Sequence, residues 1–420
     1  MSSGGVLTLS LSGRFLVNVE ALNMVESVGN VTKHRRAPIV TYSEGKYNVV
    51  YVPVVSGEAI AYHYQRLLTQ IAESMGLNVT GLDKQGYYLK YSDDDIIKNW
   101  YPEIDEKVID SKNPCDIEKA FIEASVVADV GGFLYMKKGE GDKKRSKESE
   151  SKADKDETPP LSESKADKDE TPPLIKRTSR IRFSYLVPSL DAVASGAAVL
   201  YPQLHVRYAP LPLQRVQALY YVESGSALYT LSSILVASDI AKLEYCAEEK
   251  SSKEKSSRPE KKLQSSPPSE QNKPQKSLPP EEKIKRVEAA LKALVALIDG
   301  LSFGAKRSRY LPIYETKSLI ISVFKGPIEF TVSPATDKSY IEKTLKRVEI
   351  LKKLCSQIKE ELCTAKMFIY SNEGIKIPEV KGVEVNTYES STEALWEAAH
   401  YVIALLNKQS QKTSEATPKK

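Results

Sequence analysis

A tandem duplication near the middle of the chain most restricts how it can fold. The segment SESKADKDETPPL occupies residues 149–161 and recurs letter for letter at 162–174. Lys, Asp, Glu, Ser and Pro offer too little apolar surface to offset the entropy lost on ordering. We therefore expect residues 137–174 to form a disordered loop insert without a function of its own.

Two further polar tracts have a similar composition. Residues 248–282 are rich in Lys, Ser, Pro and Glu, and a Lys-rich tail begins at 408. We expect both to be disordered as well. Because the two inserts fall between expected helices and strands, we interpret the whole chain, 1–420, as one domain with insertions.

Charge and cysteine content limit the classes of function. A net charge of +5 suits local basic patches better than a uniformly basic surface. The four cysteines show no CxxC spacing, and with only four histidines no zinc-finger, zinc-ribbon or zincin pattern can be assembled, so we expect reduced cysteines and no cofactor. The sequence has no signal peptide pattern and no apolar run long enough to span a bilayer, which predicts a soluble, cytoplasmic protein without membrane contact.

The apolar pattern indicates a mixed fold. Residues 6–22 alternate, which predicts a long strand with one buried face, and 47–55 form a second strand followed by a helix with Ser56 as its N-cap. Residues 120–130, 180–188 and 204–210 read as strands, although the first could be helical. Helices at 284–299, 339–362 and 390–406 then alternate with strands at 317–324 and 365–370. This order suits an α+β, ferredoxin-like domain with large insertions.

Three basic clusters are candidates for phosphate binding: TKHRR at 32–36, IKRTSRIR at 175–182 and FGAKRSRY at 303–310. Arginine binds phosphate oxygens in pairs, and tyrosines near these clusters, Tyr185, Tyr208 and Tyr310, could stack on bases. The junction before the helix at Ser56 could add free backbone N–H groups. Each cluster could equally be an ordinary solvated surface.

Catalytic motifs are absent from the sequence. It contains no P-loop, no nucleophile elbow and no HExxH pair. Asp129, before a glycine pair, could activate a hydroxyl, but it could also cap a turn. His205 could pack within its strand or contact a base or phosphate, and His63 and His400 lie in amphipathic helices, where we expect structural roles.

Several of these segments, taken in order, resemble one known family. NVEALNMVESVGNVTKHRRAPIV, YVPVVSGEAIAYHYQ, VVADVGGFLY, KRTSRIRFSYLVPSL, LHVRY and FGAKRSRYLP are similar to the archaeal type I-A CRISPR backbone subunit of the DevR autoregulator family, over about residues 6–405. The resemblance implies a crescent-shaped protein with a modified RRM core. It also implies a non-catalytic subunit that oligomerises along the CRISPR RNA, beside other Cascade subunits, while the target DNA strand pairs with the guide.

The resemblance also implies where RNA binds. The groove would be lined by residues 30–36, by the junction at Ser56 and Gly57 and by the region of His205, and a thumb-like loop would lie between ADVGGF and KRTSRI. Because the RNP aromatic signature of ordinary RRM proteins is absent, we expect backbone contacts that do not depend on sequence. The full set of expected RNA-binding residues is Arg14, Asn18, Asn30, Lys33, His34, Arg35, Arg36, Ser56, Gly57, Lys176, Arg177, Arg180, His205, Lys306, Arg307 and Arg309.

Two alternatives to a backbone subunit remain open. A metal-assisted ribonuclease could act through Asp129, since related type III backbone subunits cut target RNA with an aspartate of the thumb loop. A DNA-binding transcriptional autoregulator is the other, as the family name suggests.

Overall fold

The computed structural model describes residues 5–43, 45–111, 113–137, 174–208, 217–247, 277–300, 303–359 and 363–415. The chain forms two compact units. Unit 1 comprises residues 1–76, 180–240 and 280–420, and unit 2 comprises residues 77–179 and 241–279. Unit 2 is therefore inserted twice into the sequence of unit 1, and the expected single domain with insertions stays a prediction.

A ten-stranded sheet is the framework of unit 1. Its main path runs β15-β14-β13-β1-β12-β3-β2, and β9, β10 and β11 also pair with β12. The strands span Val6–Glu20 (β1), Met24–Val28 (β2), Val31–His34 (β3), Ile181–Phe183 (β9), Val187–Pro188 (β10), Ala198–Tyr208 (β11), Gln217–Val236 (β12), Ile313–Gly326 (β13), Thr364–Ser371 (β14) and Glu384–Tyr388 (β15). A separate hairpin pairs β4 (Arg36–Ser43) with β5 (Lys46–Pro53).

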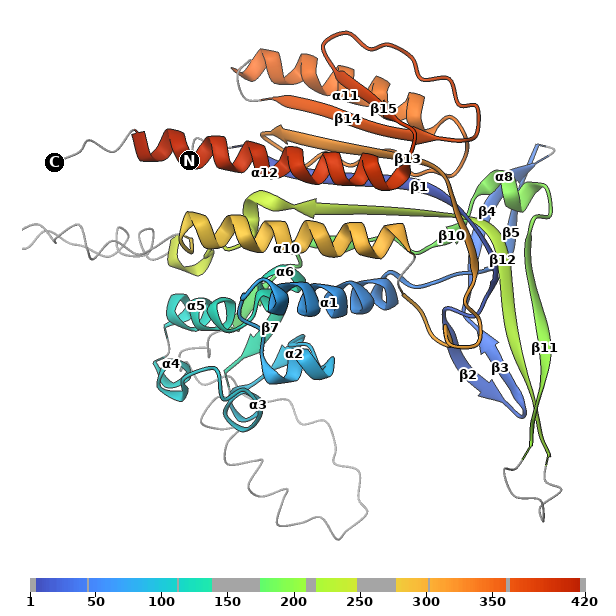
Figure 1. Ribbon diagram of the computed structural model, residues 1–420, viewed down its shortest axis with the longest axis horizontal. Helices are drawn as coiled ribbons and strands as arrows, with labels where there is room; N and C mark the ends of the chain where they lie inside the picture. Colours follow the sequence, from blue (N-terminus) through green and yellow to red (C-terminus); the bar gives the residue numbers. More distant parts are fainter. Residues whose placement is uncertain are drawn as a thin grey trace, which may run out of the picture. The chain divides into compact units, whose positions relative to one another are not determined.

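The long helices of unit 1 cover this sheet: α1 (Gly57–Ser74), α10 (Pro280–Asp299), α11 (Tyr340–Lys359) and α12 (Ser391–Glu415), with a 3-10 turn η1 at Ala237–Asp239. The short helix α8 (Leu190–Ala194) contacts β4 of the hairpin. Figure 1 shows α1, α10 and α12 as neighbouring rods, and α10 contacts both others. Since β12 and β13 both run antiparallel to β1, which lies between them, β12, α10 and β13 form a split β–α–β unit. The expected α+β fold with a ferredoxin-like core is confirmed.

Strand β1 differs from the expectation in one respect, because both of its faces are buried. Leu7, Leu9 and Leu11 form one face, and Ser10 and Ser12 lie on the other, with at most 2% of each residue exposed. The serine hydroxyls accept hydrogen bonds from the backbone N–H groups of Val332 (3.3 Å) and Ala335 (3.0 Å). The serines of β1 therefore satisfy backbone N–H groups of the buried segment around 332–335 and do not face solvent.

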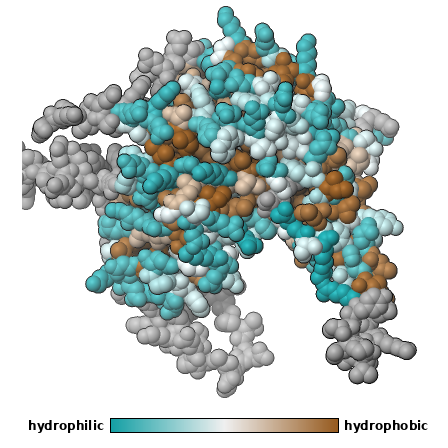
Figure 2. All heavy atoms as spheres, in the orientation of Figure 1, coloured by the Kyte–Doolittle hydropathy of each residue, from teal (hydrophilic) through white to brown (hydrophobic). Residues whose placement is uncertain are grey.

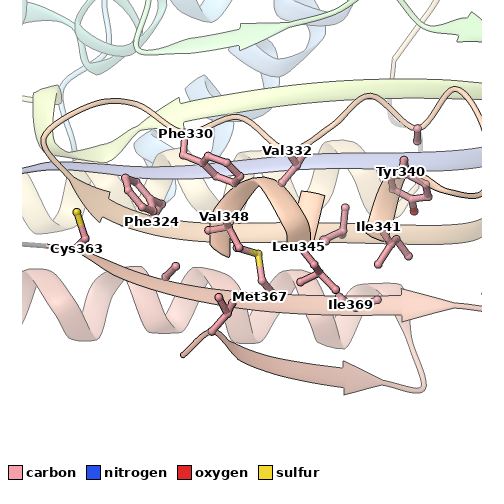
Figure 3. Close-up of a cluster of buried hydrophobic side chains, with 14 of the residues drawn as sticks. Phe324, Phe330, Val332, Tyr340, Ile341, Leu345, Val348, Cys363, Met367 and Ile369 are labelled. Carbon is pink, nitrogen blue, oxygen red and sulfur yellow. The ribbon is translucent and has the colours of Figure 1, made fainter. Parts of the chain in front are cut away.

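The C-terminal strands carry layers on both faces, which explains the continuous apolar run at 318–324. On one face, Phe324 of β13 and Met367 of β14 pack with Ile341, Leu345 and other residues of α11 (Figure 3). On the opposite face, Phe368 of β14 packs against Tyr401 of α12, with ring centroids 6.0 Å apart. Successive residues of each strand thus fill two different cores.

Unit 2 combines short helices with a small sheet. Its helices are α2 (Gly81–Gln85), α3 (Asp94–Trp100), α4 (Glu106–Asp110), α5 (Pro114–Ala124) and α6 (Val126–Gly131), with a 3-10 turn η2 at Tyr245–Ala247. The sheet pairs β6 (Tyr91–Ser92), β7 (Phe133–Met136) and β8 (Leu174–Arg177). The segment at 120–130, for which both a strand and a helix were open, is helical, because Asn113 caps α5 ahead of Pro114 and Ser125 caps α6.

Three further expectations need correction. The cysteines are paired, Cys115 with Cys246 in unit 2 and Cys355 with Cys363 in unit 1, and are not reduced. Helix α10 begins at Pro280, inside the tract expected to be disordered at 248–282. Helix α12 continues to Glu415, past the tail expected from 408, since no Gly or Pro interrupts it before Pro418. The rest of these tracts and of the loop at 137–174 lies mostly outside the described residues.

Candidate RNA-binding surface

A short segment at the end of β1, residues 20–23, connects three of the expected site regions within unit 1. The backbone O of Asn23 accepts a hydrogen bond from Arg35 N at 2.8 Å, and the backbone O of Leu22 accepts one from Ala305 N at 2.7 Å. Asn23 Oδ1 accepts from Arg35 Nε at 3.1 Å and from Ser56 N at 2.9 Å. The basic segment, the start of α1 and the loop at 303–310 are therefore neighbours.

His34 is buried between hydrogen-bond acceptors. Its Nε2 lies 2.9 Å from Glu20 Oε2 and its Nδ1 lies 2.8 Å from the backbone O of Arg35. Because a backbone carbonyl only accepts and Glu20 is ionised, both ring nitrogens donate, which requires a protonated imidazolium. Burial alone would lower the pKa of His34, but the hydrogen bond and charge of Glu20 outweigh it and raise that pKa above its ordinary value.

Glu20 shows the complementary shift. Its carboxylate also accepts hydrogen bonds from the hydroxyl of Tyr229 at 2.7 Å and from Leu22 N at 2.8 Å. Burial raises its pKa, but the hydrogen bond and charge of His34 more than reverse this and lower it. We call the two residues the Glu20–His34 pair; it fixes the basic segment to β1 and leaves His34 unavailable to a ligand.

Lys33 and Arg36 share one carboxylate. Glu223 Oε1 lies 3.0 Å from Lys33 Nζ and 2.9 Å from Arg36 Nη2, and Glu223 Oε2 accepts from His34 N at 2.9 Å. Burial raises the pKa of Glu223, but these donors outweigh it and lower that pKa. Both cations remain partly exposed, with 38% and 49% of the side chains open to solvent. Their charge is therefore accessible but partly neutralised.

A second group of cations surrounds Tyr220. The guanidinium of Arg207 lies 5.5 Å from the Tyr220 ring centroid, Arg309 Nη1 donates to the Tyr220 hydroxyl at 3.2 Å, and the His205 ring stacks on Tyr220 at 5.4 Å. Lys306 adjoins them: burial, together with the charge of Arg207, lowers its pKa. We call Arg207, Lys306 and Arg309, with Tyr220 and His205, the Tyr220 cluster.

The Tyr220 cluster keeps its positive charge. Within the described part of the chain, no carboxylate is in ion-pair contact with Arg207, Lys306 or Arg309. Arg207 and Arg309 are exposed. Lys306 also has a backbone φ of +52°, which is uncommon for a non-glycine residue. Unpaired cations beside an aromatic ring form a natural contact for phosphates and bases.

The strand register separates the two groups of cations. His205 pairs with Tyr220 and Arg207 with Ala218, so these side chains share one face of the β11–β12 ribbon. Glu223, an odd number of residues from Tyr220, lies on the other face, together with Lys33. The expected RNA-binding residues are therefore divided between the two faces of the β11–β12 ribbon: His205 lies on one face and Lys33 on the other.

Several expected RNA-binding residues have structural roles. Arg14 has 1% of its side chain exposed, and its guanidinium pairs with Asp191 and Glu373 inside the fold. Gly57 is buried where α1 meets β9, and a Cβ there would lie 2.6 Å from the backbone O of Phe183. Ser56 caps α1 through its hydroxyl, which accepts from Ala59 N at 3.2 Å. Arg180 is also buried.

The remaining expected residues lie at the edges of these groups. Asn18 is half-buried opposite Ile313, and Asn30 is exposed in the β2–β3 turn, where its backbone O accepts from Tyr221 N at 2.8 Å. Arg307 lies near His63 of α1; burial first, then the charges of Arg66 and Arg307, lower the pKa of His63 to about 4. The side chain of Tyr208 is outside the described residues.

In the basic cluster at 175–182, two of the four cations are buried, Arg177 in unit 2 and Arg180 in unit 1. Arg177 is fully buried, where its guanidinium pairs with Asp129 and, at 3.1 Å, with Glu118. Asp129 also accepts from Ala241 N through both carboxylate oxygens, at 3.1 and 3.0 Å. The ribonuclease alternative needs an accessible Asp129, and the structure gives this residue a buried, structural role. Lys176, by contrast, is exposed.

Sequence reasoning missed Arg207 and Tyr220 as part of the site. The signal for Arg207 was present: His205 and Arg207 are two apart on a strand, so their side chains lie on the same face. Tyr220 could not be found this way, because its position opposite His205 depends on the pairing of β11 with β12.

Comparison with known proteins identifies the family. Residues 11–345 match the family described as "CRISPR-associated negative auto-regulator DevR/Csa2". The chain belongs to the DevR/Csa2 family. The "CRISPR-associated aCascade subunit Cas7/Csa2 2" of Saccharolobus solfataricus is 35% identical over 374 residues, which cover 88% of this chain and 94% of the relative. The "CRISPR-associated protein Cas7/Csa2 1" of the same organism is 34% identical over 342 residues, covering 80% and 84%.

Solved structures show a more distant similarity. A chain of a "CRISPR RNA-guided surveillance complex, pre-nicking" matches 94% of this chain and 99% of its own length, with a TM-score of 0.41 and 7% identity. A chain of a second "CRISPR RNA-guided surveillance complex" has a TM-score of 0.38 and 6% identity, with the same coverage. No helix in the described ranges is long and apolar enough to cross a membrane.

Proposed function

We propose that this protein is a non-catalytic, cytoplasmic CRISPR RNA-binding subunit. Its copies would assemble along the guide RNA within a Cascade complex, beside other Cascade subunits, and the target DNA strand would pair with the guide itself. Membership of the DevR/Csa2 family and the Cascade subunit among its relatives support the proposal.

The observation that carries it is the unneutralised charge of the Tyr220 cluster. Arg207 and Arg309 present exposed guanidinium groups beside one aromatic ring, with Lys306 next to them. Their chemistry suits a phosphate backbone with a base stacked nearby, and it does not distinguish one base from another. A subunit that repeats along any guide needs contacts of this kind. Arg35, held at Asn23 beside the start of α1, would add a further phosphate contact.

Arg207→Ala combined with Arg309→Ala tests the proposal. Single-stranded RNA binding, measured by fluorescence anisotropy at several salt concentrations, should weaken equally for unrelated RNA sequences. The slope of log affinity against log salt should fall by roughly 0.7 for each phosphate that the variant no longer neutralises. Lys346→Ala is a matched control, because its side chain is 68% exposed on α11, paired only within its own helix to Glu342. Unchanged affinity, or a loss confined to particular sequences, would contradict the assignment.

Competition between single-stranded RNA and duplex DNA distinguishes the proposed RNA-binding subunit from the alternative, a DNA-binding autoregulator. A surface that binds splayed bases and 2′-hydroxyl groups should prefer single-stranded RNA over a duplex. Displacement of bound RNA by an equal concentration of duplex DNA would favour the regulator.

A further inference from the structure

The hairpin β4–β5 carries an uncharged strip on one face. The register pairs Pro38 with Tyr51, Val40 with Val49 and Tyr42 with Tyr47. Directly paired residues point to the same face, and so do residues two apart along a strand. All six side chains therefore lie together, and we call them the hairpin strip: Pro38, Val40, Tyr42, Tyr47, Val49 and Tyr51.

The hairpin strip is exposed to solvent. The exposed fractions are 60% for Val40, 65% for Tyr42, 78% for Tyr47, 62% for Val49 and 69% for Tyr51. Figure 2 shows apolar side chains gathered at the right of the molecule, where Figure 1 places β5 and β12. Single exposed apolar residues are ordinary, but a contiguous set on a soluble protein usually marks a binding surface.

The opposite face of the hairpin explains why the strip stays open. Val52 is buried, Ala37 and Ile39 are half-buried, and β5 contacts β10 and β11 while β4 contacts α8. An isolated two-stranded hairpin is marginally stable and needs such packing on one side. The hairpin thus uses one apolar face for its own stability and presents the other.

The chemistry of the strip favours a protein partner over RNA. Between Arg36 at its base and Lys46 at its tip, the strip contains neither cation nor carboxylate. A phosphate backbone needs several cations, whereas tyrosines with aliphatic neighbours are typical of protein interfaces. Copies of a chain with a net charge of +5 repel one another, and an uncharged surface lets them meet with the least repulsion.

The exposed area of the hairpin strip indicates what kind of contact it could make. Three tyrosines and two valines, each about two-thirds exposed, offer on the order of 500 Å², below the ~800 Å² per partner of a stable interface. Such a surface gives free copies only weak self-association, but it is sufficient for copies already held side by side on one strand. We propose that the hairpin strip docks on a second copy of this chain and makes RNA binding cooperative. This inference rests on the proposed function.

The test measures how the full-length protein binds a short RNA and a long RNA. Tyr47→Ser with Tyr51→Ser should leave the affinity for an RNA that holds a single copy unchanged, while the cooperative gain on a longer single-stranded RNA falls about tenfold or more. Val40→Thr with Val49→Thr is the second variant, because threonine keeps the shape and strand preference of valine. It should reduce cooperativity in the same direction. Tyr87→Ser, at a tyrosine 66% exposed in unit 2, is the control.

Each other outcome has a definite meaning. Unchanged cooperativity in both variants would overturn the proposal, and so would an equal loss on short RNA, which would make the strip an RNA contact. If the unmodified protein binds no RNA, the proposed function fails. Sedimentation at high protein concentration then tests the strip alone: weak self-association that the variants abolish supports it, and a strictly monomeric unmodified protein overturns it.

Discussion

The basic segments at 33–36 and 176–180 look alike in sequence but neutralise their charge in opposite ways. In unit 1, Lys33 and Arg36 share the single buried carboxylate of Glu223 and keep 38% and 49% of their own side chains exposed. In unit 2, Arg177 is fully buried against Asp129 and Glu118. Composition alone therefore does not separate a ligand-binding arginine from a structural one. The number of carboxylates within reach of the cation, and the burial of the cation itself, separate the two cases.

The Tyr220 cluster is the third case in this comparison. Its cations have no carboxylate partner among the described residues, so their charge is open to a ligand. The three groups form a series from fully neutralised to unneutralised charge, and we expect RNA affinity to follow that series.

The largest expected effect is on stability in unit 2. Arg177→Met would leave Asp129 and Glu118 buried without their shared cation, at a cost of about 3–5 kcal/mol in the free energy of unfolding. Urea unfolding followed by circular dichroism would measure it. Lys176→Ala, at the exposed neighbour, should change stability by less than about 0.5 kcal/mol. A small effect of Arg177→Met would mean that the two arginine environments are not as different as the structure shows.

The next effect concerns the Glu20–His34 pair and pH. The pKa of His34 is raised in the folded protein, so its contribution to stability is complete below about pH 6.5 and is lost as pH rises through the raised value. The pKa of Glu20 is lowered, so its contribution is present above about pH 4.5 and is lost as pH falls through the lowered value. The pair should therefore stabilise most between these limits.

Melting temperature against pH tests this window. The unmodified protein should lose up to about 1.4 kcal/mol per pH unit above the window, and His34→Gln should remove that slope. His63→Gln is the control for pH values above the window, because there His63, whose folded pKa is lowered to about 4, is neutral in both the folded and the unfolded protein. If the slope persists in His34→Gln, another group is responsible for it.

The smallest effect should come from Lys33. Lys33→Ala should reduce RNA affinity less than Arg207→Ala, because Glu223 already offsets part of the Lys33 charge. Glu223→Gln provides the reciprocal test: its amide oxygen can still accept from His34 N while the carboxylate charge is gone. RNA affinity should then rise by roughly two- to fivefold, equivalent to about 0.5–1 kcal/mol. Weaker RNA binding in Glu223→Gln would show that Glu223 serves only to position the segment.

Patterns within one element predicted much of the fold. The alternation at 6–22, the N-cap at Ser56 and the helical spacing in α10, α11 and α12 all correspond to observed elements. The segment at 120–130 was open between a strand and a helix because its short apolar run fits either structure, and the caps at Asn113 and Ser125 decide it. The disulfides were missed because pairing depends on spatial proximity of residues such as Cys115 and Cys246, 131 apart in sequence.

The sequence by itself determined where the positive charge lies along this chain, which segments form helices and strands, and to which family the resemblance points. Only the tertiary structure decided which charges remain available. A residue's partners come from distant parts of the chain: Glu223 reaches Lys33 and Asp191 reaches Arg14 through strand pairing and packing. Local sequence sets propensity and periodicity, whereas the exposure of a charge depends on contacts that form only when the whole unit folds.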